Sequence, residues 1–219
     1  MKTEELFKTN NSIAIDLIRK YEYPFMILPH IKEYIIELGK TLNDNYELKG
    51  ENIWIHKTAK IADNVNITGP CIIDEDAEIR PSAFIRGSAI IGKKCVFGNS
   101  CEIKNSIIFD NSQVPHFNYI GDSILGYHTH MAAGSITSNL KIDGKMIVIK
   151  NGDELIETNM RKIGAFLGDY AEVGCNSVLN PGTFIGCYSI VYPLTSVRGI
   201  IPNKKVVKDM NNIVDRRDV

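Results

Sequence analysis

The histidines of this chain are concentrated in one stretch of the sequence. His116, His128 and His130, three of the five histidines, lie within residues 114–140, which read VPHFNYIGDSILGYHTHMAAGSITSNL. Histidine changes charge near neutral pH, so it can carry a proton in catalysis or bind a metal ion as the neutral ring. His128 and His130 are two residues apart, which in a strand puts both side chains on the same side. The stretch therefore predicts either acid–base chemistry or a weak metal site.

A six-residue repeat surrounds this stretch and predicts the elements that position it. Residues 55–114 divide into hexads, from IHKTAK to FDNSQV, whose first position is always Ile or Phe and whose fifth is mostly small. An α-helix cannot keep a six-residue period on one face, and a plain strand alternates every two residues. A short strand followed by a corner satisfies the period, and three such sides make a triangular coil that buries its apolar face by stacking on the next coil. The pattern resumes at Leu125 and again over residues 167–202.

The hexad register is interrupted twice. After Val114 the segment PHFNYIGDSI is longer than one hexad and the pattern restarts four residues late, and a larger interruption covers residues 139–162. An extra segment at a corner directs side chains away from the core, and loops on rigid scaffolds commonly carry functional sites. We therefore expect both interruptions to line one cleft, between neighbouring coils or between neighbouring subunits.

The N-terminal segment has a different pattern. SIAIDLIRKY and PFMILPHIKEYIIELGKTL repeat apolar residues at three- and four-residue spacings, which predicts two helices. These helices could cover the open end of the coil, which would otherwise expose apolar surface and unpaired backbone. The predicted organisation is an N-terminal helical cap over residues 1–50, a coil domain over residues 51–202 with an insert at residues 139–162, and a C-terminal tail over residues 203–219.

Composition narrows the classes of function. The 25 basic and 26 acidic residues nearly cancel, which gives no general attraction for nucleic acid or for an anionic membrane. No apolar run reaches the length of a membrane span and the start MKTEELFKTNN lacks a secretion signal, so we expect a cytoplasmic protein. The cysteines show no CxxC spacing, and Cys71, Cys95 and Cys101 occupy the small position of the hexads, where we expect them to pack in the core.

The hexads resemble those of the hexapeptide-repeat acyltransferases, whose fold is a left-handed parallel β-helix. Within that group, residues 52–202 are most similar to the C-terminal acetyltransferase domain of the bifunctional UDP-N-acetylglucosamine pyrophosphorylase/glucosamine-1-phosphate N-acetyltransferases and to related sugar-phosphate nucleotidyltransferases. FIRG supplies Arg86, EIKNS supplies Lys104 and VPHFNYIGD supplies His116, at the spacings of the family's sugar-phosphate site. The resemblance implies a mainly β protein with the left-handed fold.

The resemblance also implies roles for individual residues. It implies that His116 is the general base, since acetyl transfer needs a neutral amine and histidine titrates in a suitable range. It implies that the backbone N–H of Ala133 faces the negative charge that develops on the thioester oxygen. The implied sugar-phosphate site consists of Arg86, Lys104, Tyr119, His130, Asn139 and Lys162, and the implied contacts with coenzyme A lie at Ala133, Cys175 and Pro193.

The activity implied by the resemblance is an acetyl-CoA-dependent N-acetyltransferase that acts on an amino-sugar 1-phosphate, assembles as a homotrimer and needs no metal. Arg86 could hold the phosphate through paired hydrogen bonds, and Lys104 could act as a point charge. The sequence departs from the family at two positions, because His130 replaces an asparagine that contacts the sugar and Ala132 replaces a glycine. The identity of the acceptor sugar therefore stays open.

Two other functions are also open. The chain could be a non-catalytic assembly or regulatory β-helix subunit related to sugar-phosphate nucleotidyltransferases, because residues 1–54 show no resemblance to the glycine-rich loop of the bifunctional enzymes. Gamma-class carbonic anhydrases share the fold and hold zinc with three histidines. His116, His128 and His130 do not reproduce the spacing of those ligands, which makes a metal enzyme the weaker alternative.

Overall fold

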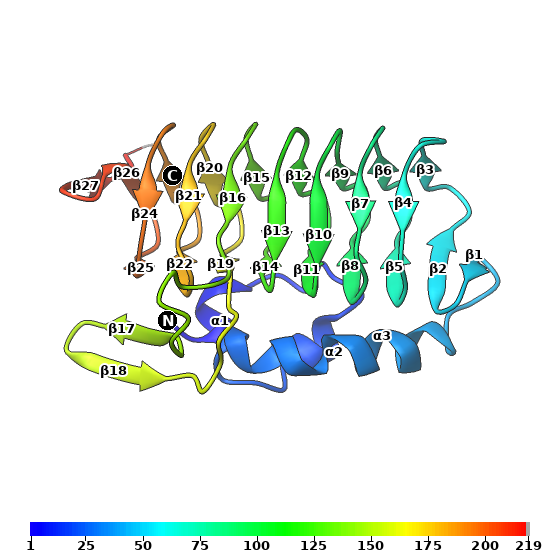
Figure 1. Cartoon of the computed structure of the whole chain (residues 1–219), viewed down its shortest axis with the longest axis horizontal. Coiled ribbons are helices and arrows are strands. Elements are labelled where there is room, and N and C mark those ends of the chain that lie inside the picture. The colour runs from blue at the N-terminus through cyan, green and yellow to red at the C-terminus, as the bar shows by residue number, and fades with distance from the viewer. Residues whose placement is uncertain (218–219) are drawn as a thin grey trace.

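Three parallel sheets wrap around a single apolar column in the computed structural model, which describes residues 1–217. The chain passes through the three sheets in turn, and each strand pairs with the strand one coil away (Figure 1). The coil winds in the left-handed sense, so the protein has the mainly β, left-handed parallel β-helix fold that the resemblance predicted. Within residues 1–217 the three sheets contain nine, nine and seven strands.

The strands of the three sheets are short and are joined by tight corners. Sheet A contains β1 (Tyr46–Gly50), β2 (Ile53–His56), β5 (Cys71–Ile73), β8 (Ala89–Ile91), β11 (Ser106–Ile108), β14 (Ile124–Leu125), β19 (Ala165–Leu167), β22 (Thr183–Ile185) and β25 (Ile200–Ile201). Sheet B contains β3 (Lys60–Ile61), β6 (Glu78–Ile79), β9 (Val96–Phe97), β12 (Gln113–Val114), β15 (His130–Met131), β20 (Glu172–Val173), β23 (Ile190–Val191), β26 (Lys205–Asp209) and β27 (Asn212–Asp215). Sheet C contains β4 (Asn66–Ile67), β7 (Phe84–Ile85), β10 (Glu102–Lys104), β13 (Tyr119–Gly121), β16 (Ile136–Thr137), β21 (Val178–Leu179) and β24 (Ser196–Val197).

The core of the coil is a column of apolar side chains. Large residues, mostly Ile and Val, fill it together with small residues at the bends. Cys71, Cys95 and Cys101 lie in this core with at most 1% of their surface exposed, which confirms the packing role expected of them. Burial raises the pKa of the Cys71 thiol to about 12 and that of the Cys101 thiol to about 11, because a thiolate there would lose its solvation. These thiols therefore stay protonated.

The register of the repeat does not slip directly after Val114. The corner at residues 115–118 has the same length as its equivalent one coil earlier, as the pairing of Val114 with Phe97 and of Tyr119 with Glu102 shows. The extra segment predicted at this corner is therefore wrong. The coils change length at a different corner, the one that joins sheet C to sheet A.

The corners between sheets C and A become one residue shorter in the middle of the coil. Gly87 and Ser88 both have positive φ in the longer form, at 89° and 51°. The two corners that are shorter by one residue each turn through a single left-handed residue, Asn105 at 45° and Asp122 at 48°. Asn and Asp adopt this conformation more readily than other residues with a side chain. The sequence therefore supplies suitable residues where the coil shortens.

Four short helical segments cover the outer face of sheet A, along the side of the coil (Figure 1). The predicted cap over the open end is therefore wrong. A parallel sheet with apolar residues on both faces has to be covered along its length. Within residues 1–217, every helix falls short of the length and apolar character that a membrane span requires. The segments are α1 (Thr3–Leu6), α2 (Ile15–Ile18), η1 (Pro24–His30, a 3₁₀ helix) and α3 (Ile31–Gly39). The outward residues of sheet A that pack with them are Trp54, Ile72, Ile90, Ile107, Ile124, Phe166 and Phe184.

Antiparallel strands extend the coil at both of its ends. β1 pairs with β2 at the first coil, and β27 pairs with β26 after the last one. Each added strand occupies a sheet edge that would otherwise present unpaired backbone groups. The tail predicted at residues 203–219 thus includes a β-hairpin, and residues 218–219 lie outside the described residues.

The insert leaves the coil after sheet C and forms a second hairpin. Its strands are β17 (Val148–Asn151) and β18 (Glu154–Glu157), which pair antiparallel to each other. Ile147 and Ile149 are buried in the same apolar cluster as the N-terminal helices. These two residues therefore tie the hairpin to the side of the coil, where Figure 1 shows it near the N-terminus.

The contact between Gly39 and Trp54 tests how the helices dock. A Cβ atom at Gly39 would lie 2.4 Å from the Trp54 ring, so Gly39→Val has to displace the ring or the helix. We expect this change to lower the free energy of unfolding by about 1–3 kcal/mol and to shift the emission of the single tryptophan toward that of exposed indole. Lys32→Val adds the same side chain on the exposed side of α3 and should leave the emission unchanged. An unchanged spectrum in Gly39→Val would contradict this docking.

Candidate active site

Four of the predicted site residues lie on one ridge of the coil, the corner between sheets B and C. His116, Ala133, Cys175 and Pro193 occupy the same position in four successive coils. The carbonyls of His116, Ala133 and Cys175 accept hydrogen bonds at 3.0, 2.9 and 2.9 Å. In each case the donor is the backbone N–H of the residue that follows the ridge residue of the next coil. The N–H of Ala133 itself has no hydrogen-bond acceptor within residues 1–217. The ridge therefore offers evenly spaced positions with a free donor one coil from His116.

A second group of predicted residues meets at the corner between sheets C and A. The side-chain NH₂ of Asn139 donates to the hydroxyl of Tyr119 at 3.1 Å and to Oδ2 of Asp122 at 2.6 Å. The Nζ of Lys104 donates to the same carboxylate oxygen at 3.3 Å. Lys162, at the end of the insert, forms an isolated bridge with the residue that follows Asn139. Lys104, Tyr119, Asp122 and Asn139 thus form one polar cluster, and the backbone bridge brings Lys162 to the same part of the coil.

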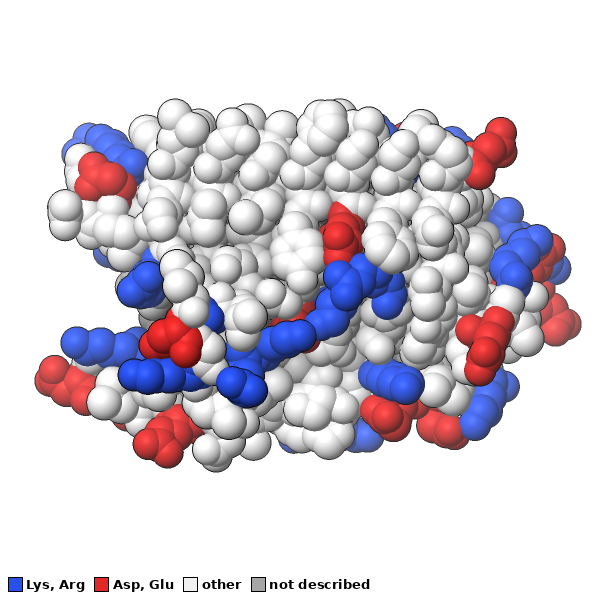
Figure 2. All heavy atoms as spheres, viewed as in Figure 1, with Lys and Arg blue, Asp and Glu red and all other residues white. Residues whose placement is uncertain are grey.

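Arg86 lies one coil before Lys104 and is held by an acidic neighbour. Its NH1 atom lies 2.5 Å from Oε1 of Glu102. This hydrogen-bonded ion pair raises the pKa of Arg86 above its usual value. Figure 2 shows that Lys and Arg side chains form a band on this face, from the front of sheet C toward the insert. Such a band is suited to an anionic ligand, and phosphate in particular.

The environment of Tyr119 keeps its hydroxyl protonated. Its pKa is raised from the usual value of 10, first because burial disfavours the phenolate and then because the carboxylates of Asp122 and Glu102 repel it. The hydrogen bond from Asn139 and the charge of Arg86 act in the opposite direction but are smaller. The hydroxyl is therefore available as a hydrogen-bond donor at neutral pH.

His130 lies on sheet B, whereas the polar cluster lies at the corner between sheets C and A. It pairs in the sheet with Gln113 and Glu172 and lines a cavity of about 430 Å³. Burial lowers the pKa of His130 below the usual 6.5; Glu172 acts to raise it, and the charge of His116 lowers it further. His130 pairs with Gln113, three residues before His116, so the two histidines lie on neighbouring coils.

His128 takes part in an aromatic stack at the corner between sheets A and B. Its ring centroid lies 5.4 Å from that of Tyr170, which lies 4.8 Å from that of Tyr188. The structure therefore separates His128 from the ridge that carries His116. Among residues 1–217, no group of three or more His, Cys, Asp or Glu side chains is arranged to hold a metal ion.

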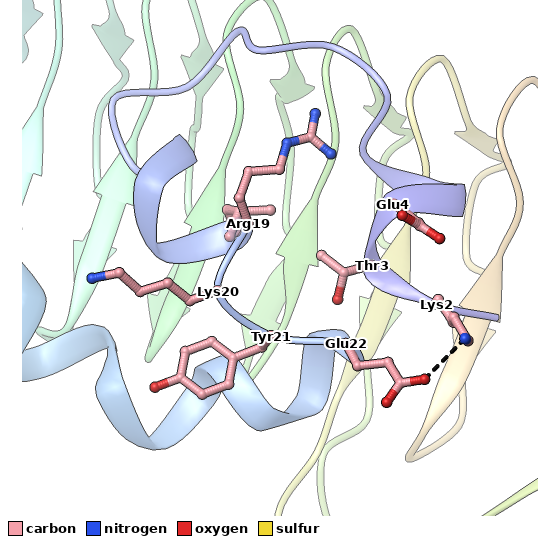
Figure 3. A pocket seen from close by; sticks show the side chains of 8 residues that line it. Lys2, Thr3, Glu4, Arg19, Lys20, Tyr21 and Glu22 are labelled. Atoms are coloured by element: carbon pink, nitrogen blue, oxygen red, sulfur yellow. Dashed lines mark ion pairs between the residues drawn. The ribbon is translucent and has the colours of Figure 1, made fainter.

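A separate hollow lies among the N-terminal helices (Figure 3). Side chains from α1 and from residues 18–22 line it, and the ion pair between Lys2 and Glu22, at 2.9 Å, lies beside it. The predicted site residues do not contribute to its lining. This hollow is therefore independent of the polar cluster and of the ridge.

Asp122 and Glu102 are site residues that the sequence prediction missed. Asp122 is only 5% exposed and contacts both Lys104 and Asn139, while Glu102 holds Arg86. The available signal for Asp122 was its place in NYIGD, three residues after Tyr119. The sequence contains 26 acidic residues, and the role of Asp122 can be recognised only when the coil shows which side chains contact it.

The left-handed coil of hexapeptide repeats defines the class of fold, and comparison with known proteins agrees with it. The family described as GMPPB C-terminal domain matches residues 67–160. The bifunctional sugar-1-phosphate nucleotidylyltransferase/acetyltransferase of Sulfurisphaera tokodaii is 34% identical over 190 residues, which cover 78% of this chain and 45% of that protein. The bifunctional protein GlmU of Methanococcus maripaludis is 40% identical over 152 residues, which cover 61% of this chain and 37% of that protein.

The comparison with solved structures includes a match to the polySia-specific acetyltransferase NeuO. It has a TM-score of 0.47 and 19% identity, and the match covers 74% of this chain and 77% of that one. The chain spans less than half the length of the two bifunctional relatives. The sequence matches confirm the resemblance to hexapeptide-repeat proteins of the bifunctional nucleotidyltransferase and acetyltransferase type.

The environment of His130 predicts its titration. We expect the midpoint, followed by NMR of the imidazole protons, to lie below the usual value of 6.5. Since the folded pKa is below the unfolded one, the contribution of His130 to stability is complete above about pH 6.5 and is lost as pH falls through the folded pKa. Glu172→Gln should lower the midpoint further, and His116→Ala should raise it. Shifts of the opposite sign would contradict the arrangement of these three side chains.

Proposed function

We propose that this chain is an acetyl-CoA-dependent N-acetyltransferase whose acceptor is an amino-sugar 1-phosphate. The observation that supports this most is the cluster of Lys104, Tyr119 and Asn139, which come from different coils and meet at one corner. A cation and a hydroxyl donor suit the phosphate, and the amide oxygen of Asn139 can accept a hydrogen bond from a sugar hydroxyl. The relative from Sulfurisphaera tokodaii, whose name combines a sugar-1-phosphate nucleotidylyltransferase with an acetyltransferase, supports the same substrate class.

In this proposal Arg86, Lys104 and Lys162 hold the phosphate, with Tyr119 as a further donor. Arginine presents two parallel donors to phosphate oxygens, whereas lysine acts as a point charge. Arg86 and Lys104 are each paired with a carboxylate. These pairs hold the two cations in place, which reduces the ordering that binding of a phosphate requires.

His116 is the proposed general base, and Ala133 is the proposed oxyanion donor. Neighbouring coils are ~4.8 Å apart, so a thioester carbonyl next to the free N–H of Ala133 would lie close to an amine beside His116. The amine attacks the carbonyl carbon, His116 takes the proton that the amine loses, and the thiolate of coenzyme A leaves. Cys175 and Pro193 continue the ridge and would contact the arm of coenzyme A through their backbone.

The variant His116→Ala tests the base. We expect it to lower the rate of thiol release from acetyl-CoA with glucosamine 1-phosphate by about 100-fold or more, the range typical of general-base removal. The fold should survive, because His116 is exposed on the ridge and its truncation leaves no core cavity. Arg86→Ala should act largely through KM, since it holds the phosphate in the ground state and the transition state alike.

His128→Ala is the matched control for this experiment, because it removes a histidine from a different corner of the same coil region. It should leave the turnover close to that of the natural protein. If His116→Ala keeps normal turnover while His130→Ala abolishes it, then the base is His130 and the proposed assignment fails. Absence of thiol release with every amino-sugar phosphate would remove the proposed activity altogether.

A homotrimer is the proposed assembly. Phe117 and Leu194 are 63% and 81% exposed on the ridge that carries His116, although each is a large apolar residue. Figure 2 shows few charged side chains over the upper part of the same face. Threefold packing of triangular coils would cover this surface and would enclose the ridge between neighbours.

Light scattering tests the assembly. The scattered mass at micromolar concentration should be three times the 24.5 kDa of one chain. The double change Phe117→Asp with Leu194→Asp should lower this mass, because a carboxylate in a buried interface is costly without a partner. A natural protein that scatters as a monomer would contradict the trimer.

A further inference from the structure

A buried carboxylate connects the polar side chains of the candidate site. Oδ1 of Asp122 accepts a hydrogen bond from Asn105 at 2.8 Å. Oδ2 accepts one from Asn139 at 2.6 Å and one from Lys104 at 3.3 Å. Burial of a carboxylate is costly unless donors replace the water that it loses. Here three donors do so, and each of them is part of the site or stands next to it.

The shortened corner fixes this carboxylate in place. Asp122 occupies the same corner as Asn105 in the next coil, and both residues have the left-handed backbone conformation. The backbone N–H of Asp122 donates to the carbonyl of Lys104 at 3.0 Å, and its carbonyl accepts from the N–H of Gly164 at 2.8 Å. Both backbone groups and both side-chain oxygens of Asp122 are therefore engaged, which leaves the carboxylate one orientation.

The carboxylate determines how the side chain of Asn139 is turned. Carboxylate oxygens only accept hydrogen bonds, so Asn139 has to direct its NH₂ group toward Asp122. The same NH₂ group then lies 3.1 Å from the Tyr119 oxygen and donates its second hydrogen to it. Because the Tyr119 oxygen accepts from Asn139, its own hydrogen is free to point at a ligand. The charge on Asp122 thus sets the direction of hydrogen bonding two side chains away.

Gly121 allows the tyrosine to reach Asn139. Tyr119 and Gly121 are two residues apart on β13, so they face the same side of the strand. A Cβ atom at Gly121 would lie 2.5 Å from the hydroxyl oxygen of Tyr119. The tyrosine ring therefore lies along its own strand in space that any side chain at position 121 would occupy.

We propose that Asp122 is a positioning residue that acts through Asn139 to make Tyr119 a hydrogen-bond donor toward the phosphate of a sugar phosphate. Gly121 is the second positioning residue, because it leaves room for the Tyr119 ring. The proposal rests on the proposed function for the class of ligand. It does not require that acetyl transfer takes place.

Simple electrostatics makes the opposite prediction for Asp122. A carboxylate near an anion site repels phosphate, so its neutralisation should tighten binding if charge alone mattered. In Asp122→Asn one of the two carboxylate oxygens is replaced by an NH₂ group, which faces either Asn105 or Asn139. Where it faces Asn139, that side chain turns its oxygen toward position 122 and toward Tyr119. Tyr119 would donate its hydrogen to that oxygen and lose it for the ligand. Positioning therefore predicts weaker binding, and the two explanations differ in sign.

Calorimetry with glucose 1-phosphate separates them, because this probe carries the phosphate but no amine. We expect Asp122→Asn to raise the dissociation constant by about 10-fold or more, the range for loss of a hydrogen bond to a charged group. Asp76→Asn is the matched control, since Asp76 is also a left-handed corner residue, at φ 56°, but is exposed and lies in another part of the coil. It should leave the dissociation constant unchanged. Equal or tighter binding by Asp122→Asn would overturn the proposal.

A double-mutant cycle tests whether Asp122 acts through Tyr119. In the Tyr119→Phe background there is no hydroxyl to orient, so Asp122→Asn should change the dissociation constant less than about 3-fold. Gly121→Ala should weaken binding on its own and should also lose most of its effect in that background. These two variants reach Tyr119 from different sides, so poor folding of one of them does not remove the test. If Asp122→Asn and Gly121→Ala change the dissociation constant by the same factor with and without the Tyr119 hydroxyl, the proposal is overturned.

The positioning role and the proposed acetyl transfer can fail independently of each other. Binding of glucose 1-phosphate that depends on Asp122 and Tyr119, without thiol release from acetyl-CoA by any amino sugar, supports the positioning role and contradicts the proposed enzyme. Thiol release that His116→Ala abolishes while Asp122→Asn leaves KM unchanged supports the enzyme and contradicts the positioning role. Absence of saturable glucose 1-phosphate binding in the natural protein overturns the positioning role directly.

Discussion

The pairing of each strand with the strand one coil away is the constraint on which the rest of this structure depends. Parallel pairing fixes the spacing of coils at ~4.8 Å and allows one register only, because a shift of one residue would turn apolar side chains out of the column. Residues that are 17 or 18 positions apart in the sequence therefore become neighbours. The ridge of His116 and Ala133 is a direct result of this pairing.

Coil length is the variable that shapes the site within this constraint. Where a coil loses one residue between sheets C and A, the corner turns through a single left-handed residue, Asn105 or Asp122. The same loss moves the inward position, so that Ile108 faces the coil core and Phe109 packs toward the N-terminal helices. One deletion thus changes both the packing behind the corner and the polar groups on it. The cluster around Asp122 depends on both changes.

The covered and open faces of the coil follow from the distribution of apolar residues. Sheet A is apolar on both sides and is buried under the helices and the insert hairpin. The two polar groups, around His116 and around Asp122, lie on the corners at either end of sheet C. A ligand can therefore approach both groups from one side of the coil, where Figure 2 shows the band of cations.

The sequence by itself determined the coil and most of its inward residues, because a period of six residues reports which side chains point inward. Through its resemblance to a known family it also supplied the candidate set of Arg86, Lys104 and His116. It did not reveal the position of the helices, the true site of the shortened corners or the role of Asp122. Those features depend on which side chains meet across coils. Only the tertiary structure decides that, since a one-residue change at a corner moves every partner while leaving the local pattern nearly the same.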